Sequence, residues 1–188
     1  MARKFILALT GASGSIYFDY TLRALLLDES IDEIAIIISD SAREVMDYEG
    51  VQLRLNDSRI TLYDNNDFFA PTASGSSLYE AMIIVPCSTG TLGRLASGVC
   101  SDLIARSGDV MLKERRKLIL ALRESPLSLI HLNNMTLLAQ CGATIMPLSP
   151  GFYPKPKSMD ELCKEFANRI ALSAGAKIKC FEWGKTDK

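Results

Sequence analysis

Short apolar runs alternate along the chain with longer segments in which apolar residues recur at helical spacing. Each run is rich in Ile, Leu, Val and Ala and carries few charges. Continuously apolar strands of this kind are typical of a parallel sheet covered by helices on both faces. With helices expected over about 15–27 and directly after Ser39, the pattern predicts a doubly wound α/β fold, Rossmann-like or flavodoxin-like. The predicted strands occupy residues 5–9, 33–38, 81–85, 118–122 and 143–146.

The composition is that of an ordinary globular chain. Its 188 residues suit one domain over 1–188. The apolar pattern does not indicate whether the C-terminal tail, from about residue 174, is ordered. A net charge of −1 argues against nucleic acid as the main partner. No apolar stretch approaches the roughly 20 residues of a membrane span. The first residues lack a signal-peptide pattern, which favours a cytoplasmic location.

The five cysteines are widely spaced and include no Cys-x-x-Cys pair, which argues against a zinc site or a redox dithiol. Most are expected to be buried free thiols. Cys87 is the exception, because it is expected in a loop before a helix, where the pKa of a thiol can fall.

Two turns between a strand and a helix are built from small and hydroxyl residues. They are 10–14, Thr-Gly-Ala-Ser-Gly, and 86–91, Pro-Cys-Ser-Thr-Gly-Thr. Small side chains let backbone N–H groups approach a phosphate, and the start of a helix adds a favourable dipole. The turns therefore predict a phosphorylated ligand at the carboxyl edge of the sheet, although Gly11 and Gly90 would also suit plain tight turns.

A mononucleotide matches these turns better than a dinucleotide or a nucleoside triphosphate does. The first turn is not Gly-x-Gly-x-x-Gly, and no acidic residue closes the second strand, where Ser39 stands. The triphosphate motif Gly-x-x-x-x-Gly-Lys-[Ser/Thr] is absent. FMN fits, with its phosphate on one turn and its ring system against the other.

Basic residues gather over 106–123. Arg106 and Lys113 are seven apart and would share one face of a helix, while Arg123 directly follows the fourth strand and would point into the ligand crevice. These three cations are candidates for binding a second phosphate, and their basic neighbours are expected on a solvated face. Since no metal-ligand cluster accompanies them and the only histidine, His131, is expected to be structural, phosphate chemistry would rely on Lys and Arg.

Two long segments lie outside the regular elements. Residues 64–77 form an expected loop, and 147–157 form a proline-rich crossing before the last helix. Both carry aromatic residues that are candidates for lining an apolar pocket, namely Phe68, Phe69, Phe152 and Tyr153.

Further motifs occur in a fixed order around these turns. They are Ile38-Ser39-x-Ser41-Ala42, Asn66-Asp67-x-x-Ala70-Pro71-x-Ala73-Ser74-Gly75-Ser76, Lys113-Glu114-Arg115-Arg116, Arg123-Glu124-x-Pro126 and Pro150-Gly151-Phe152-Tyr153. Over about residues 4–172 the sequence resembles the flavin prenyltransferases, FMN-binding partners of decarboxylases in ubiquinone and aromatic-acid metabolism. The resemblance implies metal-independent transfer of a dimethylallyl group from dimethylallyl monophosphate to N5 and C6 of reduced FMN. It also implies a homododecamer with sites shared between subunits.

The resemblance gives roles to individual residues. The implied catalytic residues are Ser13, Glu49 and Glu124. The implied FMN contacts are Gly11, Ala12, Ser13, Ser39, Ser88, Thr89, Gly90, Thr91 and Arg123. The implied ligands of the prenyl phosphate are Ser74, Arg106, Lys113, Tyr153 and Arg169.

The match weakens toward the end of the chain. Pro154 stands where many relatives have His, and beyond Arg169 only Trp183 recurs, as a residue that covers a neighbouring subunit's site. The turns would also suit a non-catalytic module that delivers FMN to a decarboxylase, in which Glu124 would have no clear role. A flavin-dependent cysteine decarboxylase shares the fold, but that activity needs a histidine near the first helix, and this chain has only His131.

Overall fold

The computed structural model describes residues 2–184, in which strands and helices alternate for most of the length. The strands are β1 (Lys4–Leu9), β2 (Glu33–Ile38), β3 (Ile60–Asp64), β4 (Ala81–Cys87), β5 (Lys117–Leu122) and β6 (Thr144–Ile145). The α-helices are α1 (Ser15–Leu26), α2 (Asp40–Tyr48), α3 (Thr89–Ala96), α4 (Leu103–Lys113), α5 (Leu129–Gln140) and α6 (Met159–Ala174). Two 3₁₀ helices, η1 (Pro71–Ala73) and η2 (Gly75–Ser77), precede β4.

The strands pair in parallel in the order β3-β2-β1-β4-β5-β6. The chain moves outward from β1 to β3, returns to place β4 beside β1, and then moves outward to β6. This confirms the doubly wound sheet, with the strand order of the Rossmann-like type. The order reverses between β1 and β4, and ligands of such folds bind at this switch point, beyond the carboxyl ends of the strands.

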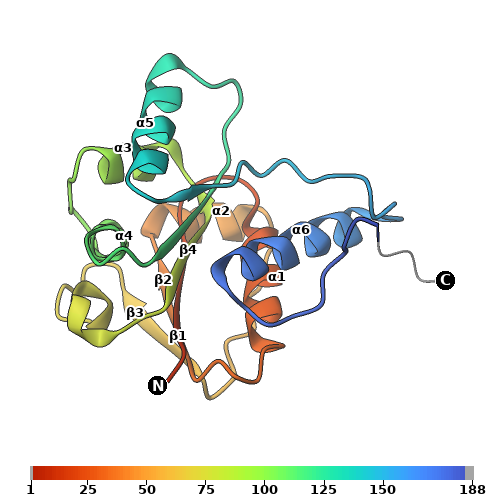
Figure 1. The fold of residues 1–188 in the computed structure, drawn as a ribbon, viewed down its shortest axis with the longest axis horizontal. Helices are drawn as coiled ribbons and strands as arrows, with labels where there is room; N and C mark the ends of the chain where they lie inside the picture. The colour runs from red at the N-terminus through yellow and green to blue at the C-terminus, as the bar shows by residue number, and fades with distance from the viewer. Residues whose placement is uncertain (1, 185–188) are drawn as a thin grey trace.

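Helices cover both faces of the sheet (Figure 1). α1, α2 and α6 pack on one face, and α3, α4 and α5 on the other. Alternate residues of β1 belong to the two cores, Phe5 and Leu7 to the first and Ile6 and Ala8 to the second. The continuously apolar strands are therefore explained by burial on both sides.

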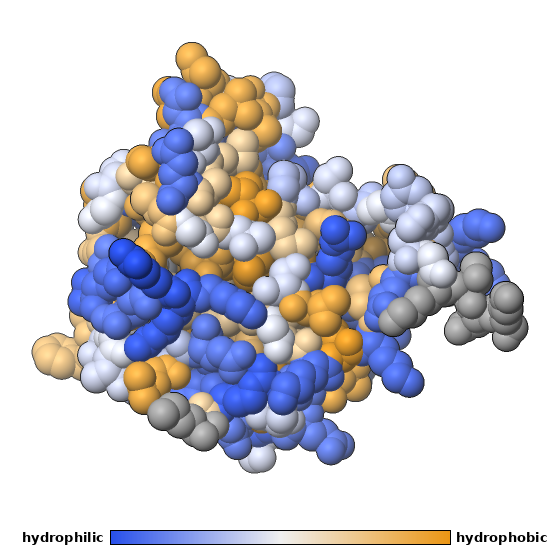
Figure 2. Space-filling view, viewed as in Figure 1, coloured by the Kyte–Doolittle hydropathy of each residue, from blue (hydrophilic) through white to orange (hydrophobic). Residues whose placement is uncertain are grey.

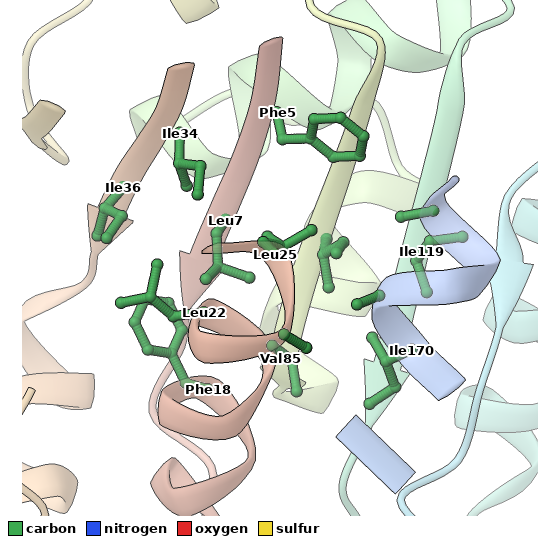
Figure 3. Packing of buried hydrophobic residues seen from close by; sticks show 14 of the residues in the cluster. Phe5, Leu7, Phe18, Leu22, Leu25, Ile34, Ile36, Val85, Ile119 and Ile170 are labelled. Atoms are coloured by element: carbon green, nitrogen blue, oxygen red, sulfur yellow. The ribbon is translucent and has the colours of Figure 1, made fainter. Parts of the chain in front are cut away.

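Figure 3 shows the first of these cores at close range. Phe18 and Leu22 of α1 and Ile170 of α6 pack against β1 and β4, and each of the three is at most 1% exposed. Burying a side chain of this size stabilises the fold by about 1.5–3 kcal/mol. The core thus fixes the strand ends from which the turns of the carboxyl edge project.

Four segments differ from the sequence prediction. The sequence analysis identifies no strand at β3, a strand at the edge of the sheet whose residues are only partly buried. The expected loop 64–77 contains η1 and η2, and the strand expected over 143–146 is limited to Thr144–Ile145. The third apolar run extends through Pro86 to Cys87, two residues further than the pattern indicates.

At the amino edge of the sheet, charged side chains pair closely. The Arg3 guanidinium donates to Asp28 (2.8 Å) and Glu80 (2.9 Å), and to the Gly175 carbonyl (2.8 Å). The Lys177 N–H donates to the same Asp28 carboxylate (2.7 Å). These bonds tie the start of β1 to the segment after α6.

That segment continues past the end of α6 and includes Trp183. The last four residues of the expected tail, 185–188, lie outside the described residues. Among residues 2–184, none of the helices is both long enough and apolar enough to cross a membrane.

Candidate functional site

The turns that follow β1, β2 and β4 form one continuous edge. The Thr10 hydroxyl accepts a hydrogen bond from the Ser88 N–H (2.8 Å) and donates one to the Pro86 carbonyl (2.7 Å). On the other side of β1, the Ser39 N–H donates to the Leu9 carbonyl (3.1 Å). The two small-residue turns therefore meet at the switch point, with Ser39 beside them.

Gly11 is the most closely packed glycine of this edge. A Cβ atom at Gly11 would lie 2.4 Å from the Ser41 Oγ atom and 2.7 Å from the Ser41 Cβ atom. The Ser41 Oγ atom lies 3.3 Å from the Ser39 Oγ atom. Only glycine allows α2 to approach the first turn this closely, and the approach brings two hydroxyl groups beside the exposed backbone.

The start of α3 offers backbone donors. Ser88 caps this helix, since its Oγ atom accepts a hydrogen bond from the Thr91 N–H (3.3 Å). Within residues 2–184, no acceptor bonds the N–H groups of Thr89 and Gly90. Free N–H groups at the start of a helix bind anions, helped by the helix dipole. This turn therefore suits a phosphate or a polar ring edge.

The start of α1, by contrast, is occupied by a carboxylate of the chain itself. Glu49 accepts hydrogen bonds from the N–H groups of Gly14 (2.7 Å) and Ser15 (2.8 Å). Burial raises the pKa of Glu49, but hydrogen bonds from Ser13 and from these N–H groups outweigh it and leave the pKa below its usual value. Glu49 is therefore ionised at neutral pH. A hollow of about 430 Å³ opens beside it, lined by Ser13, Glu44, Val45, Tyr48 and Glu49.

Arg123 and Glu124 follow directly on β5. The Arg123 N–H donates to the Cys87 carbonyl (3.1 Å), which places both residues next to the second turn. Glu124 accepts from the Ser125 N–H (2.9 Å), and its other oxygen lies 3.4 Å from the Thr89 hydroxyl. In the part of the chain that the structure describes, no carboxylate pairs with Arg123. This edge thus carries an unpaired cation and an accessible carboxylate.

Three of the implied phosphate ligands lie on the face covered by α4. Arg106 donates to the Ala73 carbonyl (3.1 Å) and pairs with Asp109 (3.0 Å), which joins α4 to η1. Lys113 pairs with Glu114, and the hydrogen bond from Lys113 lowers the pKa of that carboxyl. The three ligands on this face are Ser74, Arg106 and Lys113.

The other two implied ligands, Tyr153 and Arg169, line a pocket of about 640 Å³ on the face covered by α6. The Tyr153 ring packs edge to face against Trp183, with centroids 4.9 Å apart. Of the four aromatic candidates, only Tyr153 lines this pocket. Phe166 and Phe181 were not singled out in the sequence, although Phe166 lies one helical turn before Arg169. The aromatic lining residues are Tyr153, Phe166, Phe181 and Trp183.

One chain keeps these two groups of ligands apart, because α4 and α6 lie on opposite faces of the sheet (Figure 1). Lys113 ends α4 close to the start of β5, whereas Arg123 follows the end of β5. A strand of that length spans about 20 Å. Arg106, Lys113 and Arg123 therefore do not surround one phosphate within a single chain, contrary to the expectation from their spacing.

Two further residues were singled out in the sequence. Cys87 is the last residue of β4 and fully buried, and burial raises the pKa of its thiol to about 12. The expectation of a lowered pKa is wrong because the strand extends beyond Val85. His131 has a structural role, since its Nδ1 atom accepts from the Ser128 N–H (3.2 Å) in the capping box of α5.

The carboxylates of the site, Glu49 and Glu124, stand apart from each other, and its other charged groups are cations. Within residues 2–184, no cluster of three or more His, Cys, Asp and Glu side chains could hold a metal ion. The cations Arg123, Lys113 and Arg169 are the groups suited to a phosphate.

The chain is similar to several known flavoproteins. The model of the Flavoprotein family matches residues 1–170. Flavin prenyltransferase UbiX of Pseudomonas aeruginosa is 42% identical, over 92% of this chain and 89% of the relative. The structure of AnUbiX (PadA1) in complex with FMN and dimethylallyl pyrophosphate has a TM-score of 0.86 at 36% identity, over 97% of this chain and 100% of that chain. The structure of a dodecameric FMN-dependent UbiX-like decarboxylase from Escherichia coli O157:H7 has a TM-score of 0.88 at 32% identity, over 96% and 98%.

The matched family model and the doubly wound sheet place the protein among the flavoproteins. More specific are the identities of 42% to the P. aeruginosa relative and of 39% to Flavin prenyltransferase UbiX of Methanocaldococcus jannaschii, each over more than nine-tenths of this chain. The chain belongs to the flavin prenyltransferase family, as its motifs indicate.

Proposed function

We propose that this protein transfers a dimethylallyl group from dimethylallyl monophosphate to N5 and C6 of reduced FMN, and that a partner decarboxylase receives the prenylated product. One observation carries the proposal: the unpaired Arg123 and the accessible Glu124 stand on the same edge as the two small-residue turns. A module that only delivered FMN would need the turns, but it would not need a carboxylate within reach of Thr89.

The edge of the sheet fits FMN. Its phosphate and ring system need N–H groups, hydroxyls and a cation. The turns supply the N–H groups and hydroxyls without bulky side chains, and Arg123, which follows β5, supplies the cation. The first turn stays narrow because Gly11 packs directly on Ser41. In this proposal the flavin contacts are Gly11, Ala12, Ser13, Ser39, Ser88, Thr89, Gly90, Thr91 and Arg123.

Cations are required because a phosphate is a poor leaving group. As the allylic C–O bond breaks, negative charge grows on the phosphate, and fixed donors in a dry site stabilise it. Removing one donor of this kind typically costs about 10²–10³ in rate. The proposed phosphate ligands are Ser74, Arg106, Lys113, Tyr153 and Arg169. Lys113 must exchange its present partner, Glu114, for the phosphate.

Proton transfer is assigned to the carboxylates. The reduced flavin supplies N5 and C6 as the two nucleophilic atoms, each of which gives up one proton. The allylic double bond takes one proton as the second bond forms, and the other leaves with the phosphate. Glu124 is proposed to carry a proton from C6 to the allylic carbon. Ser13 and the ionised Glu49 are proposed to assist the loss of the proton from N5.

A second copy of the chain is needed to complete the proposed site, because one chain keeps Lys113 and Arg169 on opposite faces. The apolar exterior of α5 supports assembly: Leu129 and Ile130 are each 71% exposed, and apolar surface gathers over this helix (Figure 2). Contiguous exposed apolar surface marks interaction sites. A homododecamer, as in the E. coli relative, is the proposed assembly.

The choice of substrate is tested by supplying reduced FMN with either dimethylallyl monophosphate or the pyrophosphate, under anaerobic conditions. We expect faster turnover with the monophosphate, one inorganic phosphate released per flavin consumed, and NMR signals for new bonds at N5 and C6. Equal or faster turnover with the pyrophosphate, or a product substituted elsewhere, would contradict the proposal.

The shared site is tested by co-expressing two inactive variants, Lys113→Ala and Arg169→Ala. If the two ligands come from different chains, some mixed sites contain both native side chains, and activity returns. If one chain supplied both ligands, every site would lack one of them and the mixture would stay inactive. Each variant expressed alone is the control.

A further inference from the structure

The hydrogen-bond ladder between β1 and β4 ends before the turns of the site begin. Its last paired residues are Ala8 and Ile84, and the register of β4 with β5 shifts between Ile84 and Cys87. Pro86 lies in this interval and has no N–H group to donate to a neighbouring strand. The regular main-chain ladder therefore stops short of the two turns.

A single side chain spans this interval. The Thr10 hydroxyl donates to the Pro86 carbonyl (2.7 Å) and accepts from the Ser88 N–H (2.8 Å), whereas the Thr10 N–H reaches the same carbonyl only at 3.4 Å. Thr10 is 2% exposed, so water does not compete for these bonds. One hydroxyl thus joins the two turns where the ladder stops.

Both of the bonded turns carry proposed flavin contacts. Ser88, whose N–H Thr10 holds, is the capping residue of α3, so its orientation also sets that of the free N–H groups of Thr89 and Gly90. On the first turn, the Thr10 carbonyl accepts from the Ala12 N–H (2.8 Å). A change in the Thr10 hydroxyl would therefore reach both sides of the flavin site.

We propose that Thr10 is a positioning residue that sets the spacing of the two flavin-binding turns through its hydroxyl group, without touching the flavin. This inference rests on the proposed function, because it assumes that FMN lies across these turns. It predicts that FMN binding depends on the hydroxyl of Thr10 and depends little on its methyl group.

The test compares Thr10→Val, which keeps the shape but removes the hydroxyl, with Thr10→Ser, which keeps the hydroxyl. Thr21→Val is the matched control, because Thr21 is also buried and its hydroxyl has no hydrogen-bond partner among the described residues. FMN affinity is measured by fluorescence quenching, and the KM for FMN, kcat and Tm are measured on the same samples.

We expect Thr10→Val to weaken FMN binding about tenfold or more and to raise the KM for FMN. Thr10→Ser should stay within about threefold of the unmodified protein, and Thr21→Val should leave FMN binding unchanged. Weak binding by Thr10→Ser, or native binding by folded Thr10→Val, would overturn the proposal. If Thr10→Val does not fold, Thr10→Ala makes the same test, because it also removes the hydroxyl that joins the two turns.

Binding and transfer are separate readouts. If the unmodified protein binds FMN but transfers no prenyl group, the proposed function fails while the role of Thr10 is still decided by affinity. An unmodified protein that binds no FMN would overturn both.

Discussion

The two edges of the sheet use the same kinds of side chain in opposite ways. At the amino edge, Arg3 is fully engaged by Asp28, Glu80 and the Gly175 carbonyl. At the carboxyl edge, Arg123 has no carboxylate partner within residues 2–184, and Glu124 makes only one short bond, to a backbone N–H. The charges at the first edge are bonded to one another, while Arg123 and Glu124 at the second remain available to a ligand.

The groups that stabilise the fold and the groups available for catalysis therefore lie at opposite edges of the sheet. Paired charges at the amino edge hold together segments far apart in the chain, since Asp28 also binds the N–H of Lys177. Unpaired groups at the carboxyl edge contribute little to stability but are placed by a rigid core. Substitutions at the two edges should therefore have separable effects, on folding at one and on catalysis at the other.

The largest expected effect is on catalysis. Glu124→Gln should lower kcat for prenyl transfer by about 10²–10⁴, because it removes a general acid–base group, while FMN affinity stays near that of the unmodified protein. Anaerobic turnover assays and flavin titration measure the two quantities. Glu29→Gln, an exposed change remote from the carboxyl edge, is the control. Retention of full activity in Glu124→Gln would remove Glu124 from the mechanism.

The next effect is on folding. Asp28→Asn should lower the free energy of unfolding by about 3 kcal/mol, because it leaves the Arg3 charge partly buried without one of its partners. Burial raises the pKa of Asp28, but bonds from Ser30, Lys177 and Arg3 leave the pKa far below its usual 3.8. The contribution of Asp28 to the free energy of unfolding is therefore complete above about pH 3.8 and is lost as the pH falls further.

Denaturant unfolding measures that loss, with Asp47→Asn on the surface of α2 as the control. The folded fraction of Asp28→Asn should keep native kcat. A variant that stays as stable as the unmodified protein, or that loses kcat while folded, would contradict the separation of the two edges.

A smaller effect is expected on binding. Arg123→Met should weaken FMN affinity about tenfold to a hundredfold, since a hydrogen bond to a charged group contributes about 1.5–3 kcal/mol. Its Tm should change little, because no carboxylate among residues 2–184 pairs with the native side chain. Arg54→Met, on the exposed segment before β3, is the control for the loss of one positive charge. Unchanged affinity in Arg123→Met would mean that Arg123 does not contact the flavin.

The smallest effect concerns Glu49, which lies at the carboxyl edge but is engaged by α1. Glu49→Gln should lower the free energy of unfolding by about 0.5–1 kcal/mol at neutral pH, the usual value of a charge at a helix start. The pKa of Glu49 is below 4.5 in the folded protein. The difference in the free energy of unfolding between the unmodified protein and Glu49→Gln is therefore present above about pH 4.5 and disappears as the pH falls through the lowered pKa. Unfolding curves between pH 7 and 3 test this, and a difference independent of pH would contradict it.

The fold could be predicted from the sequence because burial on both faces leaves a strong apolar signal in β1, β2, β4 and β5. β3 leaves no such signal, since it lies at the sheet edge and is only partly buried. Cys87 was misplaced for a related reason: Pro86 looks like the end of a strand, but β4 continues through it.

The site was predictable in part. Turns that follow strands must meet at the carboxyl edge, so the residues of both turns and Arg123 could be placed by topology alone. The position of Lys113 could not be predicted from its spacing with Arg106, because α4 returns toward the amino edge and carries Lys113 about 10 Å beyond Arg106 along its axis. The capping of α1 by Glu49 also depends on tertiary packing and leaves no mark in the sequence.

In the proposed reaction, FMN at the carboxyl edge is a substrate and not a resident cofactor. The most direct measurement is the mass of the flavin extracted after the protein is incubated anaerobically with reduced FMN and dimethylallyl monophosphate. We expect the flavin to gain the mass of one C5H8 unit, and Glu124→Gln to yield little of this product. Flavin of unchanged mass from the unmodified protein would show that FMN is not prenylated.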